Sequence, residues 1–253
     1  MKRILFLIIL WAFACVAEDS VYFVQLTDAH LGPEDNFERT RAAVEAINAL
    51  PMDVAFVAVT GDIMQNSIGD SNVVKEARAI FSHLEMPVHF VPGNHDLLKK
   101  APLKTVAAFT NSFGPLISSA EYGGVQFVFV CTEPLAGGVQ IEGYDPLGEL
   151  EPLLEDHPTV VFHHAPSADG FYKNTMHNGW GRSEIGRQWV ELLNRHDVKA
   201  VIAGHFHRGE MYWLGDVPLY VCAPIAGKWG RQASFRIYEY SDGHLNYRTQ
   251  YIQ

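Results

Sequence analysis

Six apolar segments of this chain stop abruptly at polar or small residues, and this repeated ending constrains the fold more than any other feature. Short apolar runs bounded in this way predict buried β-strands. The segments and the residues that follow them are 21–27 before Asp28-Ala29-His30, 54–60 before Gly61-Asp62, 88–92 before Gly93-Asn94-His95-Asp96, 125–130 before Cys131-Thr132-Glu133, 160–162 before His163-His164 and 198–203 before Gly204-His205-Phe206-His207. Because ligands bind at the carboxyl ends of strands in an open α/β sheet, five of these endings predict one shared site. We interpret the ending at Glu133 as scaffold.

Helical patterns lie between several of these segments. Apolar residues recur at three- and four-residue spacing over 37–47, 73–84 and 185–193, which indicates amphipathic helices. Asp35-Asn36 precedes the first pattern and Asp70-Ser71 precedes the second, and both pairs are typical helix start signals. This strand–helix–strand rhythm predicts parallel strands joined by right-handed crossovers.

The C-terminal part of the chain has a different pattern. Short strand-like runs are separated by dipeptides typical of hairpin turns, Gly215-Asp216 and Asp242-Gly243. The runs cover residues 211–214, 219–222, 235–240 and 245–252. We expect them to form an antiparallel sheet that packs on the first sheet, with helices outside. The sequence shows no internal repeat and no low-complexity linker, so a single domain is predicted.

Composition narrows the classes of partner. A chain of 253 residues with 48% hydrophobic content suits one ordinary α/β domain. The net charge is −10 and the sequence contains no basic block, which argues against a nucleic-acid duplex as a partner.

The first residues have the pattern of a secretory signal peptide. Lys2-Arg3 precedes an apolar run over 4–13, which is shorter than the roughly 20 residues that a spanning helix needs. We therefore expect a signal peptide over residues 1–17, no transmembrane span, and a mature domain over 18–253 in the periplasm or secreted. Alternatively, the residues up to Cys15 resemble a bacterial lipoprotein cleavage box, in which case Cys15 would carry a lipid anchor.

The two other cysteines, Cys131 and Cys222, both follow apolar strand-like runs. The simplest interpretation is two buried thiols that behave as small hydrophobic groups. A disulfide between them is an alternative in an oxidising compartment.

The residues at the strand ends have the chemistry of a two-metal site. Asp28 and His30 lie two residues apart and can reach one ion, whereas the two carboxylate oxygens of Asp62 can bridge two ions. Asn94 offers a neutral carbonyl oxygen, and the histidines at the last two endings supply imidazoles. Nitrogen and oxygen ligands without thiolate suit Zn, Fe or Mn. Two cations about 3.5–4 Å apart can clamp a phosphoryl group and activate a water, so no serine or cysteine nucleophile is needed.

In this order, the blocks Asp-x-His, Gly-Asp, Gly-Asn-His-Asp, His and Gly-His-x-His resemble the calcineurin-like metallophosphoesterase family over about residues 21–240. The resemblance implies an α/β fold, a four-layer sandwich of two mixed β-sheets flanked by helices, with a dinuclear metal site at the carboxyl ends of the strands. It assigns the first metal ion to Asp28, His30, Asp62 and His207, and the second to Asp62, Asn94, His164 and His205. It also implies that His95 contacts the phosphoryl group and protonates the leaving oxygen. Asp96 either orients His95 or caps the next turn.

The doublet His163-His164 requires a choice, because side chains alternate along a strand and only one of the two can face the metals. Family members usually place the ligand two residues before a proline, which selects His164 before Pro166. His163 is then interpreted as a hydrogen-bonded core histidine.

The resemblance implies an enzyme that hydrolyses small phosphomonoesters or phosphodiesters with two di- or trivalent transition-metal ions. The segment after Asp62 lacks the arginine of the protein phosphatase branch, so phosphoproteins are not favoured as substrates. The alternatives are a non-catalytic protein that binds phosphorylated ligands on the same fold, and a metal-storage protein. The loop over 167–181 could form a substrate wall, with Phe171, Tyr172 or Trp180 stacking on a nucleobase and Lys173 or Arg182 meeting a second phosphate. An ordinary surface loop explains the same residues.

Overall fold

The structure is a computed structural model that describes residues 20–154, 157–168, 180, 183–227 and 230–252. The predicted signal peptide over 1–17, including Cys15, lies outside the described residues. So do the loop positions Phe171, Tyr172, Lys173 and Arg182.

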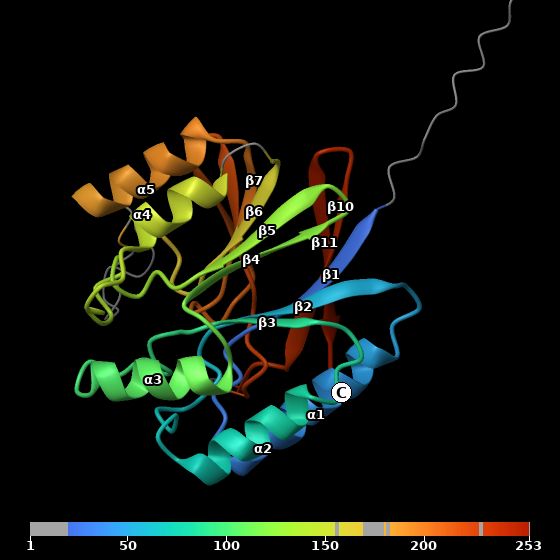
Figure 1. The fold of residues 1–253 in the computed structure, drawn as a ribbon. Helices are drawn as coiled ribbons and strands as arrows, with labels where there is room; N and C mark the ends of the chain where they lie inside the picture. The colour runs from blue at the N-terminus through green and yellow to red at the C-terminus, as the bar shows by residue number, and fades with distance from the viewer. Residues whose placement is uncertain (1–19, 155–156, 169–179, 181–182, 228–229, 253) are drawn as a thin grey trace, which may run out of the picture.

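Two mixed sheets form the centre of the molecule (Figure 1). The first has the strand order β11-β10-β1-β2-β3, and its three ligand-bearing strands β1, β2 and β3 run parallel. The second has the order β4-β5-β6-β7-β9-β8, with β5, β6, β7 and β9 parallel. The strands are β1 (Val21–Leu26), β2 (Val54–Thr60), β3 (Val88–Val91), β4 (Ile117–Tyr122), β5 (Val125–Val130), β6 (Thr159–Phe162), β7 (Val198–Ala203), β8 (Glu210–Leu214), β9 (Val217–Val221), β10 (Ser234–Ser241) and β11 (His244–Tyr251).

Helices cover the outer face of each sheet, which confirms the predicted four-layer sandwich. Figure 1 shows α1, α2 and α3 on the outer side of the first sheet, and α4 and α5 on the outer side of the second. Their bounds are α1 (Glu34–Asn48), α2 (Ser71–Phe81), α3 (Pro102–Ser112), α4 (Pro146–Leu150) and α5 (Glu184–Arg195), with a 3-10 helix over Glu151–Leu154. None of the helices in the described part of the chain combines the length and apolar composition that crossing a bilayer requires.

An aromatic core holds the two sheets together. The Phe23 ring stacks between Phe56 and Tyr238, with ring centroids 5.0 Å apart in both pairs. Phe127 and Phe162 from the second sheet meet Phe23 edge-on. Such aromatic pairs add about 0.5–1.5 kcal/mol each beyond the burial of their area. Separate apolar clusters lie under the helices of each outer layer, so the contacts between layers are mostly apolar.

The C-terminal strands correct one prediction. They form two hairpins, as the turn dipeptides indicated, but the hairpins do not pair into one antiparallel sheet. The β8–β9 hairpin extends the second sheet through β7, and the β10–β11 hairpin extends the first sheet through β1. The turn residues determine how the two strands of a hairpin pair with each other. They do not determine which sheet the hairpin joins, and each of the two sheets had an edge strand free to pair.

Helix starts agree with the sequence only in part. Asp70 caps α2 by accepting hydrogen bonds from the backbone N–H groups of Asn72 and Val73, as predicted. In contrast, Pro33 occupies the cap of α1, and the Asn36 side chain donates to the His30 carbonyl instead. Cys131 and Cys222 are both free and buried, which confirms the simpler interpretation over the disulfide.

Candidate metal centre

The predicted ligands gather at one edge of the molecule because both sheets direct the carboxyl ends of parallel strands toward it. Asp28 and His30 follow β1, Asp62 follows β2 and Asn94 follows β3 in the first sheet. The second sheet contributes the ligands that follow β6 and β7, namely His164, His205 and His207.

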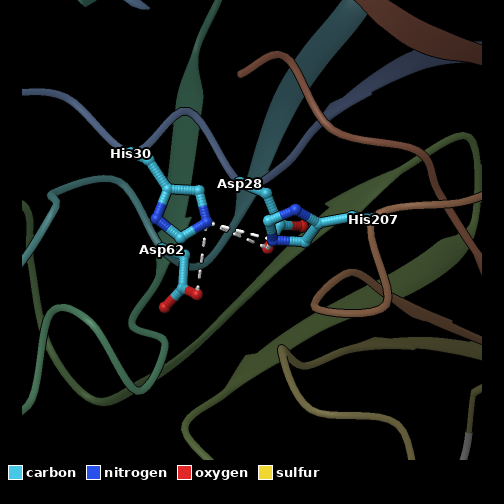
Figure 2. Close-up of side chains that lie close together, drawn as sticks. All are labelled: Asp28, His30, Asp62 and His207. Atoms are coloured by element: carbon cyan, nitrogen blue, oxygen red, sulfur yellow. Dashed lines mark hydrogen bonds and ion pairs between the residues drawn. The ribbon is translucent and has the colours of Figure 1, made fainter. Parts of the chain in front are cut away.

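Four of these side chains form a first cluster (Figure 2). Asp28, His30, Asp62 and His207 each offer one ligand atom, and the four atoms lie within 4.8 Å of one another. The Nε2 atoms of His30 and His207 are 3.1 Å apart, and His207 Nε2 is 3.0 Å from Asp28 Oδ1. All four residues are buried. Two imidazole nitrogens and two carboxylate oxygens therefore converge on one point.

A second cluster shares Asp62 with the first. Its members, Asp62, His164 and His205, also offer ligand atoms within 4.8 Å of one another. Asp62 Oδ2 is 3.3 Å from His164 Nε2 in this cluster and 3.7 Å from His30 Nε2 in the other. In the turn after β3, the buried Oδ1 atom of Asn94 has no hydrogen-bond partner among the described residues. A cation would satisfy that oxygen.

Other groups fix the orientation of the ligands. Asp28 Oδ2 accepts hydrogen bonds from Thr27 Oγ1 at 2.7 Å and from the His205 backbone N–H at 2.9 Å, which leaves Oδ1 facing the first cluster. Asp62 Oδ1 accepts from the His95 backbone N–H at 2.8 Å, which leaves Oδ2 facing both clusters. Bonds of this kind orient metal ligands in many proteins.

His164 is oriented in the same manner. Its Nδ1 lies 2.8 Å from the Thr60 carbonyl oxygen, so Nδ1–H donates there and Nε2 faces Asp62. Gly61 permits this approach: it has φ +85°, and a Cβ atom on it would lie 2.3 Å from His164 Nδ1. The glycine before Asp62 is therefore a requirement of the site and not only of the turn.

The backbone at the ligands is strained. Seven non-glycine residues in the described part of the chain have positive φ, and five of them are candidate ligands: Asp28, His30, Asp62, His205 and His207. The left-handed region costs an L-residue about 1–2 kcal/mol. Backbone hydrogen bonds hold it in place, for example from the Asp28 N–H to the Gly61 carbonyl and from the His30 N–H to the Asp62 carbonyl. Strain of this kind clusters at functional sites.

The electrostatics favour a cation in the centre. Burial alone would raise the pKa of Asp28 and Asp62, but the neighbouring imidazoles of His207 and His164 lower both pKa values. Burial likewise opposes protonation of His164, yet the Asp62 carboxylate raises its pKa well above the usual range. Each carboxylate thus relies on a positive partner. The converging nitrogen and oxygen atoms, the burial and the unpaired Asn94 oxygen fit two metal ions.

His95 lies at the edge of the clusters. Its ring meets the His30 ring edge-on at 4.9 Å, and it is only partly buried. His95 Nδ1 is 2.9 Å from Asn66 Oδ1, a contact that the sequence analysis missed. The only signal in the sequence was an asparagine four residues after Asp62. The structure places this asparagine in a loop with φ 59°, a left-handed conformation that asparagine tolerates.

Asp96 does not orient His95. Its carboxylate accepts hydrogen bonds from the backbone N–H groups of Gly93, Ile63 and Met64 at 2.8–3.2 Å. The turn-capping alternative is therefore the observed one, and Asp96 also joins the end of β2 to the turn after β3.

His163 is a core residue, as the alternation argument predicted. It is buried, its Nδ1 is 3.1 Å from Thr132 Oγ1, and burial lowers its pKa to about 3. The ring packs against Trp180 and Trp189. Trp180 is itself buried and its Nε1–H donates to the Ala165 carbonyl, so the suggestion that Trp180 stacks on a nucleobase is wrong.

Glu133, at the end of the scaffold strand β5, is a buried carboxyl group. Its Oε1 atom has no hydrogen-bond partner among the described residues. Burial raises its pKa to about 7, and the Asp62 carboxylate contributes in the same direction. In the metal-free protein, a neutral carboxyl group thus lies near the two clusters at acidic pH.

Glu133→Gln is expected to change how stability depends on pH. The folded pKa of Glu133, about 7, lies above the ordinary glutamate value of 4.5, so the folded state binds the extra proton between these two pH values. The stability that the proton contributes is present below pH 4.5 and is lost as the pH rises through 7, by at most about 3 kcal/mol. Urea unfolding of metal-free protein from pH 4.5 to 8 should show a smaller loss in Glu133→Gln than in the wild type, because buried Asp96, whose pKa is also raised to about 7, contributes a loss of the same sign in both proteins. The exposed Glu121→Gln is the control and should lose as much stability as the wild type, and an equal loss in Glu133→Gln and the wild type would contradict the assignment.

Comparison with known proteins agrees with this geometry. The profile of the calcineurin-like phosphoesterase family matches residues 21–209, more than half of the chain. The serine/threonine-protein phosphatase CPPED1 of Mus musculus is 25% identical over 211 residues, which are 76% of this chain and 66% of that protein. The chain thus spans just under two thirds of the length of that relative.

Two further similarities extend over most of the chain. A protein of Rhodopseudomonas palustris, named as a probable cyclic nucleotide phosphodiesterase, is 26% identical over an alignment that covers 88% of this chain and 82% of that protein. A dimetal phosphatase from Danio rerio has the same fold, with a TM-score of 0.63 and 14% identity over 92% of this chain and 99% of that one. Fold, the geometry of the candidate ligands and the family profile agree: the chain belongs to the calcineurin-like phosphoesterase family.

Proposed function

We propose that the protein hydrolyses small phosphomonoesters or phosphodiesters with two transition-metal ions. The observation that carries this proposal is the position of Asp62 Oδ2, 3.7 Å from a histidine of the first cluster and 3.3 Å from a histidine of the second. Two cations on either side of this oxygen would clamp a phosphoryl group and lower the pKa of a water between them toward about 7.

The two clusters define which residues would hold each ion. Asp28, His30, Asp62 and His207 would hold the first. Asp62, His164 and His205, with the buried Asn94 oxygen, would hold the second. Imidazole, carboxylate and amide ligands without thiolate suit Zn, Fe or Mn.

His95 is proposed to donate a proton to the leaving oxygen. Asn66 Oδ1 accepts a hydrogen bond from His95 Nδ1–H, which fixes the orientation of the imidazole. The other ring nitrogen, Nε2, is then the atom that would donate the proton to the leaving oxygen. The ring stands beside His30 at the partly exposed edge of the site, where a substrate can arrive. General acid catalysis requires such reach together with a fixed orientation.

A small phosphorylated molecule is the proposed substrate class. The phosphodiesterase of Rhodopseudomonas palustris supports this class because its alignment covers most of both chains. The test is hydrolysis of an aryl phosphate and of its bis ester by the purified protein loaded with Zn, Fe or Mn. A panel of nucleotides, cyclic nucleotides, sugar phosphates and glycerophosphodiesters then defines the substrate. Full two-ion loading without hydrolysis of any of them would favour the non-catalytic binding protein instead.

We also propose export followed by cleavage between Ala17 and Glu18. The support is the positive start, the short apolar run and the small residues before Glu18. Intact-mass measurement on protein from an exporting bacterial host should give a chain that begins at Glu18. A mass that corresponds to diacylglyceryl-Cys15 would replace this prediction with anchoring by lipid.

A further inference from the structure

Gln25 places a polar side chain in the aromatic core between the two sheets. It is completely buried and lies on β1, three residues before the candidate ligand Asp28. Its Nε2 donates to Thr60 Oγ1 at 2.8 Å and to the Ala203 carbonyl at 2.9 Å. Its Oε1 accepts from the Tyr238 hydroxyl at 3.0 Å. Both amide donors and one acceptor site are therefore used.

The partners of Gln25 stand directly before other ligands. Thr60 is the last residue of β2, two residues before Asp62. Ala203 is the last residue of β7, two residues before His205. One side chain thus joins three strand ends that lead into the two clusters, and the bond to Ala203 crosses from the first sheet to the second.

The contacts continue from Gln25 to the ligand atoms. The carbonyl of Thr60 accepts from His164 Nδ1 at 2.8 Å and lies 3.0 Å from Thr27 Oγ1. Thr27 Oγ1 is also 2.7 Å from Asp28 Oδ2. Thr60, to which Gln25 is bonded, therefore contacts both His164 of the second cluster and Thr27, which orients Asp28 of the first cluster.

A buried amide between the two sheets is less favourable for stability than an apolar side chain. Moving an amide out of water costs about 1–3 kcal/mol in proteins unless its hydrogen bonds are replaced, and an apolar side chain would fill the core without that cost. A network whose members are all bonded favours a single arrangement of the strands that it connects. The apolar contacts between the sheets are less directional and fix the spacing less closely.

We propose that Gln25 is a positioning residue for the metal centre. It sets the ends of β1, β2 and β7 at the spacing at which ligands from the two sheets converge. The inference rests on the proposed two-metal function. It predicts that loss of the amide weakens metal binding by more than the accompanying loss of stability explains.

The test compares Gln25→Leu with Phe56→Leu. Phe56 is also completely buried in the core between the sheets and lies on a ligand-bearing strand, but it has no polar contact with the site. Zn²⁺ affinity is measured by competition with a chromophoric chelator, and stability by urea unfolding of the metal-free proteins. We expect both variants to lose stability and only Gln25→Leu to lose Zn²⁺ affinity, by at least about tenfold, the range found for residues that orient metal ligands.

Thr60→Val provides a second measurement, also if Gln25→Leu does not fold. It removes the hydroxyl partner of Gln25 and keeps the carbonyl that His164 uses. Alone it should weaken Zn²⁺ binding, and added to Gln25→Leu it should cost no further affinity. Equal Zn²⁺ affinity of Gln25→Leu and Phe56→Leu, or unchanged affinity of Thr60→Val, would overturn the positioning role. A wild type that never binds two ions would instead overturn the proposed function.

Discussion

Asp62→Asn should weaken both metal sites together, by at least about 100-fold in affinity, which is the upper end of the losses seen when only supporting residues are removed. The reason is geometric. Asp62 Oδ2 faces His30 in one cluster and His164 in the other, so one carboxylate would serve both proposed ions. The amide of Asn lacks the charge that both ions require. Metal analysis after equilibrium dialysis, together with chelator competition, measures the two affinities.

Asp28→Asn is the matched control for this experiment. Asp28 is equally buried, but its free oxygen Oδ1 faces His30 and His207 of the first cluster only. The control should lose the first ion and keep the second. A wild type that binds a single ion, or an Asp62→Asn variant that keeps one site at full affinity, would disprove the bridging role.

His95→Ala should keep both metals and the fold but slow the hydrolysis of alkyl phosphates by about 10²–10⁴-fold, the usual range for general acid catalysis. An alkoxide leaving group has a high pKa and needs a proton, whereas a nitrophenolate leaves without one. The loss on nitrophenyl phosphate should therefore be smaller. Steady-state kinetics on the two substrates, with metal content measured in parallel, provides the comparison.

Asn66→Ala tests the general-acid role of His95 through the residue that orients its ring. It keeps the imidazole and removes the oxygen to which His95 Nδ1 is bonded. We expect a smaller loss with the same dependence on the leaving group. Equal losses on both substrates in His95→Ala would show that His95 positions the phosphoryl group without donating a proton. Full activity on both would contradict any role for His95.

The sequence predicted which candidate ligands lie together because their signal is local. A polar residue that ends an apolar segment is visible without any knowledge of the sheet order, and Asp28, Asp62 and His164 all lie where the endings placed them. The choice between His163 and His164 likewise followed from alternation along one strand. The structure confirmed that His163 points into the core.

What the sequence did not show depends on contacts between distant segments. The hairpin at Gly215 and the hairpin at Gly243 have similar turn signals, yet they join different sheets. Asn66 meets His95 only because two loops fold over each other, and the periodicity of neither segment encodes that. β4 (Ile117–Tyr122) was missed because it is an edge strand with no fully buried residue and little apolar pattern.

The left-handed backbone at five candidate ligands has a consequence for attempts to improve this protein. Glycine would occupy those φ values at less cost than Asp or His, so the chain gives up stability at the positions that are proposed to bind metal. Selection for thermal resistance of the metal-free protein alone would favour replacement of these candidate ligands. A thermally more stable variant must therefore be selected for catalytic activity and thermal stability together, because substitutions at these positions affect the two properties in opposite directions.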